Sequence, residues 1–360
     1  MSNPTLRLST RVRGVSPYAT PIPAAPIDLR LDANEGPPAP IDLAAIARLL
    51  PDGEIARYPS ARALEAALAA RWSVEPQNIL VTSGGDDAIH RACQAVLEPS
   101  RDLILPMPTF EMIPRYATLA GARIIEIPWP RGPYPASRIC EAVTAQTAMI
   151  ALVSPNNPTG AVATRDDLER ICRAAPHALV LVDAAYAEFA DEDLTEAAIS
   201  LPNTLVVRTF SKALGCAGLR VGYCVGPADL ITALRAAGGP YPVSSLSLLV
   251  ARHALETSSQ TLSRVVPRIR DERAKLSQQL ARRGADVFPS QANFVLAQFT
   301  NAPSTWAALA SQGILVRRFS PASGLERCLR ITLPGSASAF DRLTAAFETA
   351  LRPQREGMLP

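Results

Sequence analysis

Short apolar runs alternate with amphipathic stretches through the middle of this 360-residue chain. The runs are nearly all apolar and are bounded by glycine, proline or polar residues, which is typical of buried strands. The predicted strands are residues 79–82, 103–105, 124–127, 148–153, 178–183, 204–207 and 220–225. Because helical periods separate them, we expect an α/β fold with a mostly parallel seven-stranded sheet that helices cover on both faces.

The pattern changes after about residue 245. A long helical stretch covers residues 246–283, and Pro267 should kink or divide it. Strands then follow at 293–299, 314–317 and 328–333, with helices at 306–311 and 339–351. This order of elements predicts a second, smaller α+β domain.

The N-terminal segment is rich in proline, with seven prolines between residues 17 and 40. Proline disfavours a helix, so we expect an extended arm that packs with the smaller domain. The predicted division is an arm at residues 1–40, a large ligand-binding domain at 41–245 and a small C-terminal domain at 246–360.

Charge and cysteine content narrow the possible functions. The 36 basic and 33 acidic residues are mixed along the chain and give a net charge of +3, so we expect no nucleic-acid partner and no membrane anchor. The six cysteines form no C-x-x-C pair and none lies near a histidine at metal-ligand spacing. We therefore expect no metal site and a cytoplasmic, reducing environment.

Lys212 stands directly after a strand that is predicted to be buried. Burial disfavours the ammonium ion and lowers its pKa below about 10.4, which leaves an amine able to form a Schiff base with an aldehyde. Ser211 and Arg220 flank it with hydrogen-bond donors suited to a phosphate. This group suggests an aldehyde cofactor that carries a phosphate, although a lysine here also fits a solvated helix start.

Other loops follow predicted strands and should meet Lys212 beyond their carboxyl ends. Gly85 and Asp86 open a helix, where N–H groups and the helix dipole favour an anion. Asp183 ends a strand, and its carboxylate either pairs with a protonated ring nitrogen or caps the next helix.

Three more residues could contact the ring of such a cofactor. Asn157 and Tyr186 could donate to a phenolic oxygen, and Phe110 could stack on the ring face. Alone, Asn157 fits an ordinary Asn-Asn-Pro turn and Phe110 an ordinary core position. The arrival of all these residues at strand ends is what favours a cofactor pocket.

These residues and their order resemble the fold-type I aminotransferases that use pyridoxal 5′-phosphate, and within them the histidinol-phosphate aminotransferase family. The resemblance covers about residues 14–335, with 154–160 and 208–223 its most specific segments. Tyr18, the segment 57–59 and Arg317 favour this branch. The resemblance implies a transaminase of histidine biosynthesis that runs a ping-pong cycle between histidinol phosphate and 2-oxoglutarate.

The resemblance also implies a role for each residue. The catalytic residues would be Lys212, which holds the cofactor and moves the proton, Asp183 at the pyridine nitrogen, and Tyr186 at the phenolic oxygen. The other cofactor ligands would be Gly85, Asp86, Ser211, Arg220, Phe110, Asn157 and, across a homodimer interface, Tyr58. The substrate ligands would be Arg330, Arg317, Tyr18 and Asn34.

Four positions depart from the family pattern. Gly85 stands where serine or alanine is usual, Phe110 where tyrosine is usual, and Ala184 where glutamate is usual, and the segment 333–335 also differs. The changes at Phe110 and Ala184 bear on substrate identity more than on catalysis. An aromatic amino acid aminotransferase of the same family, a threonine-phosphate decarboxylase and a non-catalytic cofactor-binding protein are the alternatives.

Overall fold

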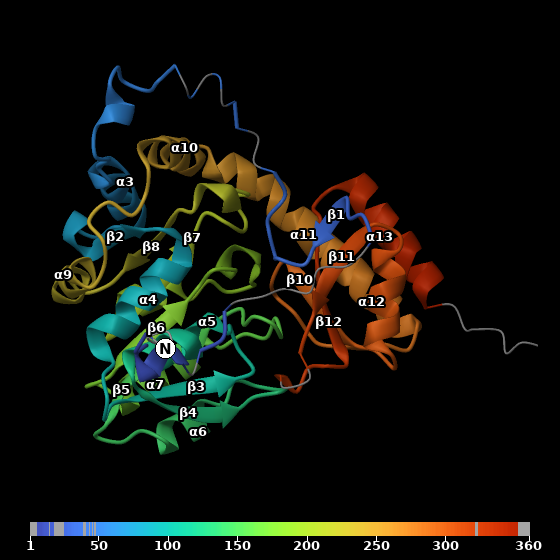
Figure 1. The fold of residues 1–360 in the computed structure, drawn as a ribbon, viewed down its shortest axis with the longest axis horizontal. Coiled ribbons are helices and arrows are strands. Elements are labelled where there is room, and N and C mark those ends of the chain that lie inside the picture. Colours follow the sequence, from blue (N-terminus) through green and yellow to red (C-terminus); the bar gives the residue numbers. More distant parts are fainter. Residues whose placement is uncertain are drawn as a thin grey trace, which may run out of the picture.

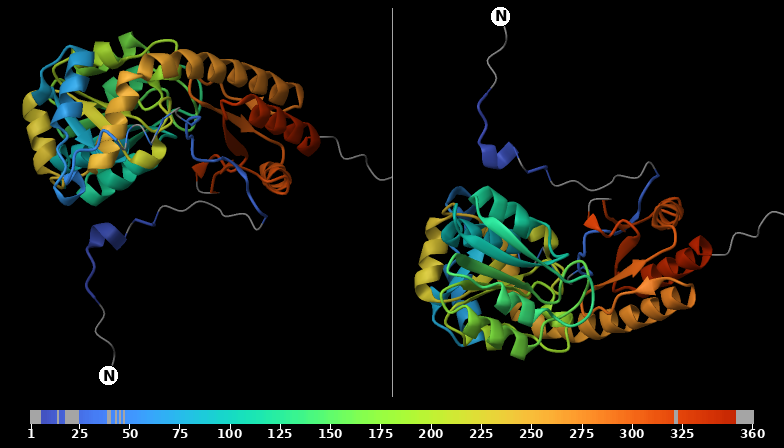
Figure 2. Two further views of the ribbon diagram at one scale, coloured as in Figure 1. Left: turned by 90° about the horizontal axis from the view of Figure 1, so that it is seen from above. Right: turned by 90° about the horizontal axis from the view of Figure 1, so that it is seen from below.

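The computed structural model describes residues 6–13, 15–17, 25–38, 41–42, 44, 46, 48–320 and 323–351. Within these residues, two β-sheets lie in two separate bodies (Figure 1). The long helix α11 (Ser258–Arg282) runs from the larger body into the smaller one, and Figure 2 shows residues 25–38 of the arm, in blue, beside the smaller body.

The described strands of the larger body form one sheet of seven, in the order β2-β8-β7-β6-β5-β3-β4. All of them run in one direction except β8, which is antiparallel to both neighbours. This confirms the expected mostly parallel sheet. Their bounds are β2 (Ile79–Thr82), β3 (Asp102–Met107), β4 (Arg123–Pro128), β5 (Thr147–Val153), β6 (Leu179–Asp183), β7 (Thr204–Thr209) and β8 (Gly222–Val225).

Helices cover both faces of this sheet because successive strand residues point to opposite sides. On β3, Leu103 and Leu105 join the core beneath α4, α5 and α9, while Ile104 joins the core beneath α6, α7 and α8. The bounds of the helices are α3 (Arg62–Trp72), α4 (Gly84–Val96), α5 (Met112–Ala120), α6 (Ala136–Glu141), α7 (Arg165–Ala174), α8 (Thr195–Ile199), α9 (Ala228–Ala236) and α10 (Ser245–Glu256).

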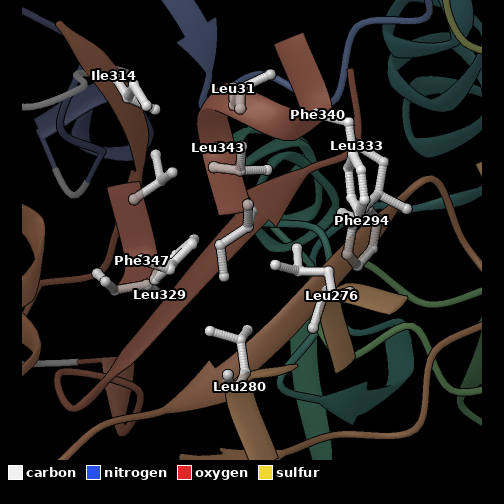
Figure 3. Close-up of a cluster of buried hydrophobic side chains, with 14 of the residues drawn as sticks. Leu31, Leu276, Leu280, Phe294, Ile314, Leu329, Leu333, Phe340, Leu343 and Phe347 are labelled. Carbon is white, nitrogen blue, oxygen red and sulfur yellow. The ribbon is translucent and has the colours of Figure 1, made fainter. Parts of the chain in front are cut away.

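The smaller body has the strand order β1-β11-β12-β10-β9. The arm supplies β1 (Leu29–Leu31), which pairs in parallel with β11 (Ile314–Arg318), and the fold class with a smaller α+β unit is thereby confirmed. The remaining elements are β9 (Asp286–Val287), β10 (Phe294–Gln298), β12 (Cys328–Thr332), α12 (Ala302–Ala310) and α13 (Ala337–Ala350). Figure 3 shows the core of this body, where Leu31 joins a cluster of leucine and phenylalanine side chains.

One local expectation was wrong, because the arm that was expected to be extended holds one helical turn, α1 (Thr10–Arg13). The long helical stretch divides at Thr257, whose hydroxyl donates to the carbonyl of His253, and Pro267 lies inside α11. Apolar residues on both sides of Pro267 pack on the core, and this packing outweighs the cost of about 3 kcal/mol that an interior proline carries.

Two expectations are not settled by these elements. The boundaries at residues 40 and 245 stay predictions, and Tyr18 lies outside the described residues. Among the residues that are described, no helix has both the length and the hydropathy to cross a bilayer.

Leu31 offers a test of how firmly the arm is held. Its side chain is 3% exposed, whereas the neighbouring Arg30 side chain is 64% exposed. Leu31→Ala should lower the free energy of unfolding by about 2–5 kcal/mol because it leaves a cavity in the core. Arg30→Lys, the matched control, keeps the positive charge beside the buried Asp32 and should change it by less than about 0.5 kcal/mol. Urea unfolding followed by circular dichroism would contradict this if both variants shared one midpoint.

Candidate active site

A pocket of about 1850 Å³ lies where the carboxyl ends of the parallel strands face the smaller body. The loops that follow β2, β3, β4, β5, β6 and β7 reach it, and the arm and the small sheet close the other side. The predicted site residues that line it are Asn34, Gly85, Asp86, Phe110, Asn157, Asp183, Tyr186, Ser211, Lys212, Arg220, Arg317 and Arg330. The convergence expected from strand ends is therefore present in the fold.

Lys212 is presented by a tight turn after β7. The Thr209 hydroxyl accepts the Ser211 N–H at 3.1 Å, and the Lys212 carbonyl accepts the Gly215 N–H at 3.0 Å, which fixes the turn. The Lys212 ammonium donates to the carbonyl of Ala33 at 3.2 Å. Burial lowers the pKa of Lys212 to about 8, and the positive charge of Arg330 adds to this effect. The amine is thus far easier to deprotonate than that of an exposed lysine.

Asp183 ends β6, which pairs with β7, the strand that precedes the Lys212 turn. One carboxylate oxygen accepts the Ala185 N–H at 3.1 Å, so the local capping role and the pocket position coexist. Burial raises the pKa of Asp183 to about 6, and the Ala185 hydrogen bond only partly opposes this. A cationic group in the pocket would stabilise the ionised carboxylate, which suits the protonated nitrogen of a pyridine ring.

The N-terminus of α4 forms a cradle with the start of β8. A Cβ on Gly222 would lie 2.5 Å from the Gly84 carbonyl carbon, so this close approach of two backbones requires glycine. The Arg220 guanidinium lies near Gly84 and is 3.5 Å from the Asp86 carboxylate. Helix N–H groups and a guanidinium meet here, and the Ser211 hydroxyl lines the same pocket, so together these donors could hold a phosphate.

A segment of the arm, residues 32–36, lies over Lys212 and joins the two bodies. The Asn34 amide donates to the Tyr186 hydroxyl at 3.0 Å and its carbonyl oxygen accepts from the Thr332 hydroxyl at 3.0 Å. A Cβ on Gly36 would lie 1.7 Å from the Lys212 carbonyl oxygen, so no larger residue fits there without moving the arm. Sequence patterns did not indicate this cover because its partners are about 150 to 300 positions away.

Two arginines face each other on adjacent strands of the small sheet. Arg317 of β11 and Arg330 of β12 are direct partners in the antiparallel register. Arg330 donates to the Asn157 side-chain oxygen at 2.5 Å and to the Asp32 carbonyl at 2.7 Å, and Arg317 donates to the Glu111 carboxylate at 3.0 Å. Like charges directly opposite are unfavourable, so the pair forms a site that an anion would stabilise.

A buried ion cluster behind the pocket fixes the two loops that carry Tyr186 and Lys212. Arg208 of β7 donates to the carboxylates of Glu188 and Asp193, each at 2.7 Å. Sequence analysis assigned no role to these residues, although Arg208 belongs to a motif segment. Arg208 is a charged residue directly after a run that was predicted to be a buried strand, and this position could have indicated that it has carboxylate partners.

Tyr58 stands apart from the other predicted residues. It is 80% exposed and stacks on Tyr241 at a ring distance of 4.6 Å, and it is not among the residues that line the pocket. The fold of one chain does not bring Tyr58 to this pocket, so its role stays a prediction.

Comparison with known proteins places this geometry in a family. The model for aminotransferase class I and II matches residues 27–347. A histidinol-phosphate aminotransferase of Caldanaerobacter subterraneus subsp. tengcongensis is 36% identical and covers 96% of this chain and 98% of its own, and one of Chromobacterium violaceum is 36% identical over 89% and 91%. The crystal structure of histidinol-phosphate aminotransferase from Sinorhizobium meliloti in complex with pyridoxal-5′-phosphate has a TM-score of 0.85 at 25% identity, covering 96% and 98%.

The pKa of Lys212 predicts how the apoprotein reacts with pyridoxal 5′-phosphate. Only a neutral amine attacks an aldehyde, so the rate should rise with pH and have its midpoint near pH 8, where Lys212 loses its proton. Stopped-flow absorbance measures it. The chain has one other lysine, Lys275, whose side chain is 63% exposed, so Lys212→Ala is a clean control. A midpoint near pH 10 would show that the amine is not buried.

Proposed function

This chain belongs to the aminotransferase class I and II family, and from this we propose that it moves the amino group between histidinol phosphate and 2-oxoglutarate. It is a pyridoxal-phosphate-dependent transaminase, and the proposal concerns its substrates and the roles of its residues. Relatives at 31–36% identity over most of the chain carry the name histidinol-phosphate aminotransferase, which supports histidinol phosphate as the substrate here.

The observation that carries the substrate proposal is the opposed pair Arg317 and Arg330 at the pocket wall. Two guanidinium groups suit a phosphate, which carries about −1.5 to −2 charge at neutral pH. The same groups can bind a carboxylate of glutamate in the other half-reaction. One anion site that serves both substrates is what a ping-pong cycle needs.

The cofactor chemistry fits the residues around Lys212. Pyridoxal 5′-phosphate supplies a cationic ring that withdraws electrons from the substrate α-carbon. Asp183 would hold the ring nitrogen protonated, while Ser211, Arg220 and the α4 N-terminus, with Gly85 and Asp86, would hold the phosphate.

The remaining pocket residues would orient the ring and move the proton. Asn157 and Tyr186 would hydrogen-bond the phenolic oxygen, with Asn34 fixing the Tyr186 hydroxyl, and Phe110 would stack on the ring. Lys212 would carry the cofactor and then, as a neutral amine, take the proton from the substrate α-carbon.

We also propose a homodimer in which Tyr58 reaches the phosphate of the neighbouring site. An exposed apolar surface supports this, formed by Leu49, Ile55, Tyr58, Tyr241 and Leu246. The Tyr58–Tyr241 stack and a hydrogen bond from Ser245 to Glu54 hold its two segments together. Apolar groups gathered in this way are typical of an interface. We place the enzyme in the cytoplasm, which suits its six free cysteines.

A half-reaction screen tests the substrate proposal. The holoenzyme is mixed in turn with histidinol phosphate, phenylalanine, tyrosine and glutamate, and the loss of the cofactor absorbance is followed. Histidinol phosphate should react at least about tenfold more efficiently than the aromatic amino acids, because its phosphate carries about −1.5 to −2 charge to the arginine pair where their α-carboxylate carries −1. Glutamate should react as the second substrate, because it offers two carboxylates. Lys212→Ala should abolish the change. A faster reaction with phenylalanine, or release of carbon dioxide from threonine phosphate, would overturn the proposal.

Subunit complementation tests the role of Tyr58. Tyr58→Ala should weaken cofactor binding by about tenfold or more, since a hydrogen bond to a charged group is lost. When this variant is mixed with inactive Lys212→Ala, heterodimers should regain activity because one of their sites has both residues intact. Sedimentation of the wild type as a monomer, or no recovery on mixing, would contradict the dimer proposal.

A further inference from the structure

Glu111 places a negative charge inside the anion pocket. It immediately precedes α5 of the larger body, and its side chain is 42% exposed. One oxygen accepts from Arg317 at 3.0 Å and the other accepts from Arg115 at 3.2 Å. The carboxylate thus bridges two arginines and crosses the pocket from the large body to the small sheet.

This contact has a direct consequence for any ligand of Arg317, whose side chain is only 11% exposed. A carboxylate of the protein already neutralises the guanidinium that an incoming anion must bind. The ligand either displaces Glu111 or binds beside it against its charge. Both routes weaken anion binding. When the ligand binds beside Glu111, the repulsion grows with the charge of the ligand, so a phosphate loses more affinity than a carboxylate does.

We propose that Glu111 is a specificity-determining residue: a resident counter-ion that limits the affinity of Arg317 for anions and restrains phosphate more than carboxylate. The proposal rests on the proposed function, in which one arginine pair binds a phosphate and a carboxylate in alternation. A site of unopposed arginines would hold the dianion and obstruct the other half-reaction. Glu111 brings the two affinities closer together.

The alternative role for Glu111 is to hold Arg317 in the right orientation, and it predicts the opposite sign. If Glu111 competes with the ligand, its neutral isostere binds anions more tightly. If it only orients the arginine, the isostere binds them more weakly. The chain supplies a matched control in Glu126, which lines the same pocket and therefore carries the same charge there, while the carboxylate paired with Arg317 is that of Glu111.

The test is titration calorimetry of the holoenzyme with inorganic phosphate and with propionate at pH 8. In Glu111→Gln the Kd for phosphate should fall about three- to five-fold, the range expected of a partly exposed ion pair, and that for propionate should fall less. Glu126→Gln should change either Kd by less than about twofold. In an Arg317→Gln background, Glu111→Gln should have no such effect.

An unchanged or raised phosphate Kd in Glu111→Gln would overturn the proposal, as would an equal gain in Glu126→Gln. Absence of phosphate binding in both the wild type and Glu111→Gln would overturn it too. The thermal midpoint and the cofactor spectrum show whether each variant is folded and loaded. The titration needs no turnover, so failure of histidinol phosphate as a substrate would leave its result intact, and the reverse also holds.

Discussion

The structure depends on the partial burial of the Lys212 amine, which lines the pocket beneath the arm. A lysine on a turn at a strand end is normally solvated, and here the arm segment 32–36 covers it and accepts its hydrogen bond through Ala33. The cost of burying this charge appears as its lowered pKa. Asp183, buried nearby, is shifted in the opposite direction for the same reason. The surroundings of both groups favour their neutral forms. A ligand with a cationic ring nitrogen would stabilise the Asp183 carboxylate, and its aldehyde would react with the neutral Lys212 amine.

The arrangement of strands and loops around the pocket was predictable because it depends on local pattern. Apolar runs bounded by glycine and proline gave the sheet, and residues just past those runs, such as Asp183 and Lys212, had to meet at one edge. The reversed direction of β8 was not predictable in the same way. Arg220 before this strand has a positive φ of 52°, and Gly222 fits closely against Gly84, and these are constraints of the folded backbone that no periodicity records.

The contacts that complete the site lay beyond sequence reasoning for a physical reason. Asn34, Thr332 and Tyr186 come from three distant segments and form one chain of hydrogen bonds in a buried place. Buried polar groups need hydrogen-bond partners, but the sequence alone does not indicate which donor pairs with which acceptor. Glu111 shows the same limit, since a glutamate ahead of a helix is unremarkable until the small sheet brings Arg317 against it.

The arm couples the two bodies through a single stretch of backbone. Its strand β1 pairs with β11, the strand that carries Arg317, and a few residues later Gly36 packs against the Lys212 carbonyl. Arg330 donates a hydrogen bond to the Asp32 carbonyl in the same stretch. The segment 32–36 therefore contacts both the small sheet and the turn that carries Lys212. The position of the small sheet and the cover of Lys212 are linked in this fold because one short peptide segment contacts both.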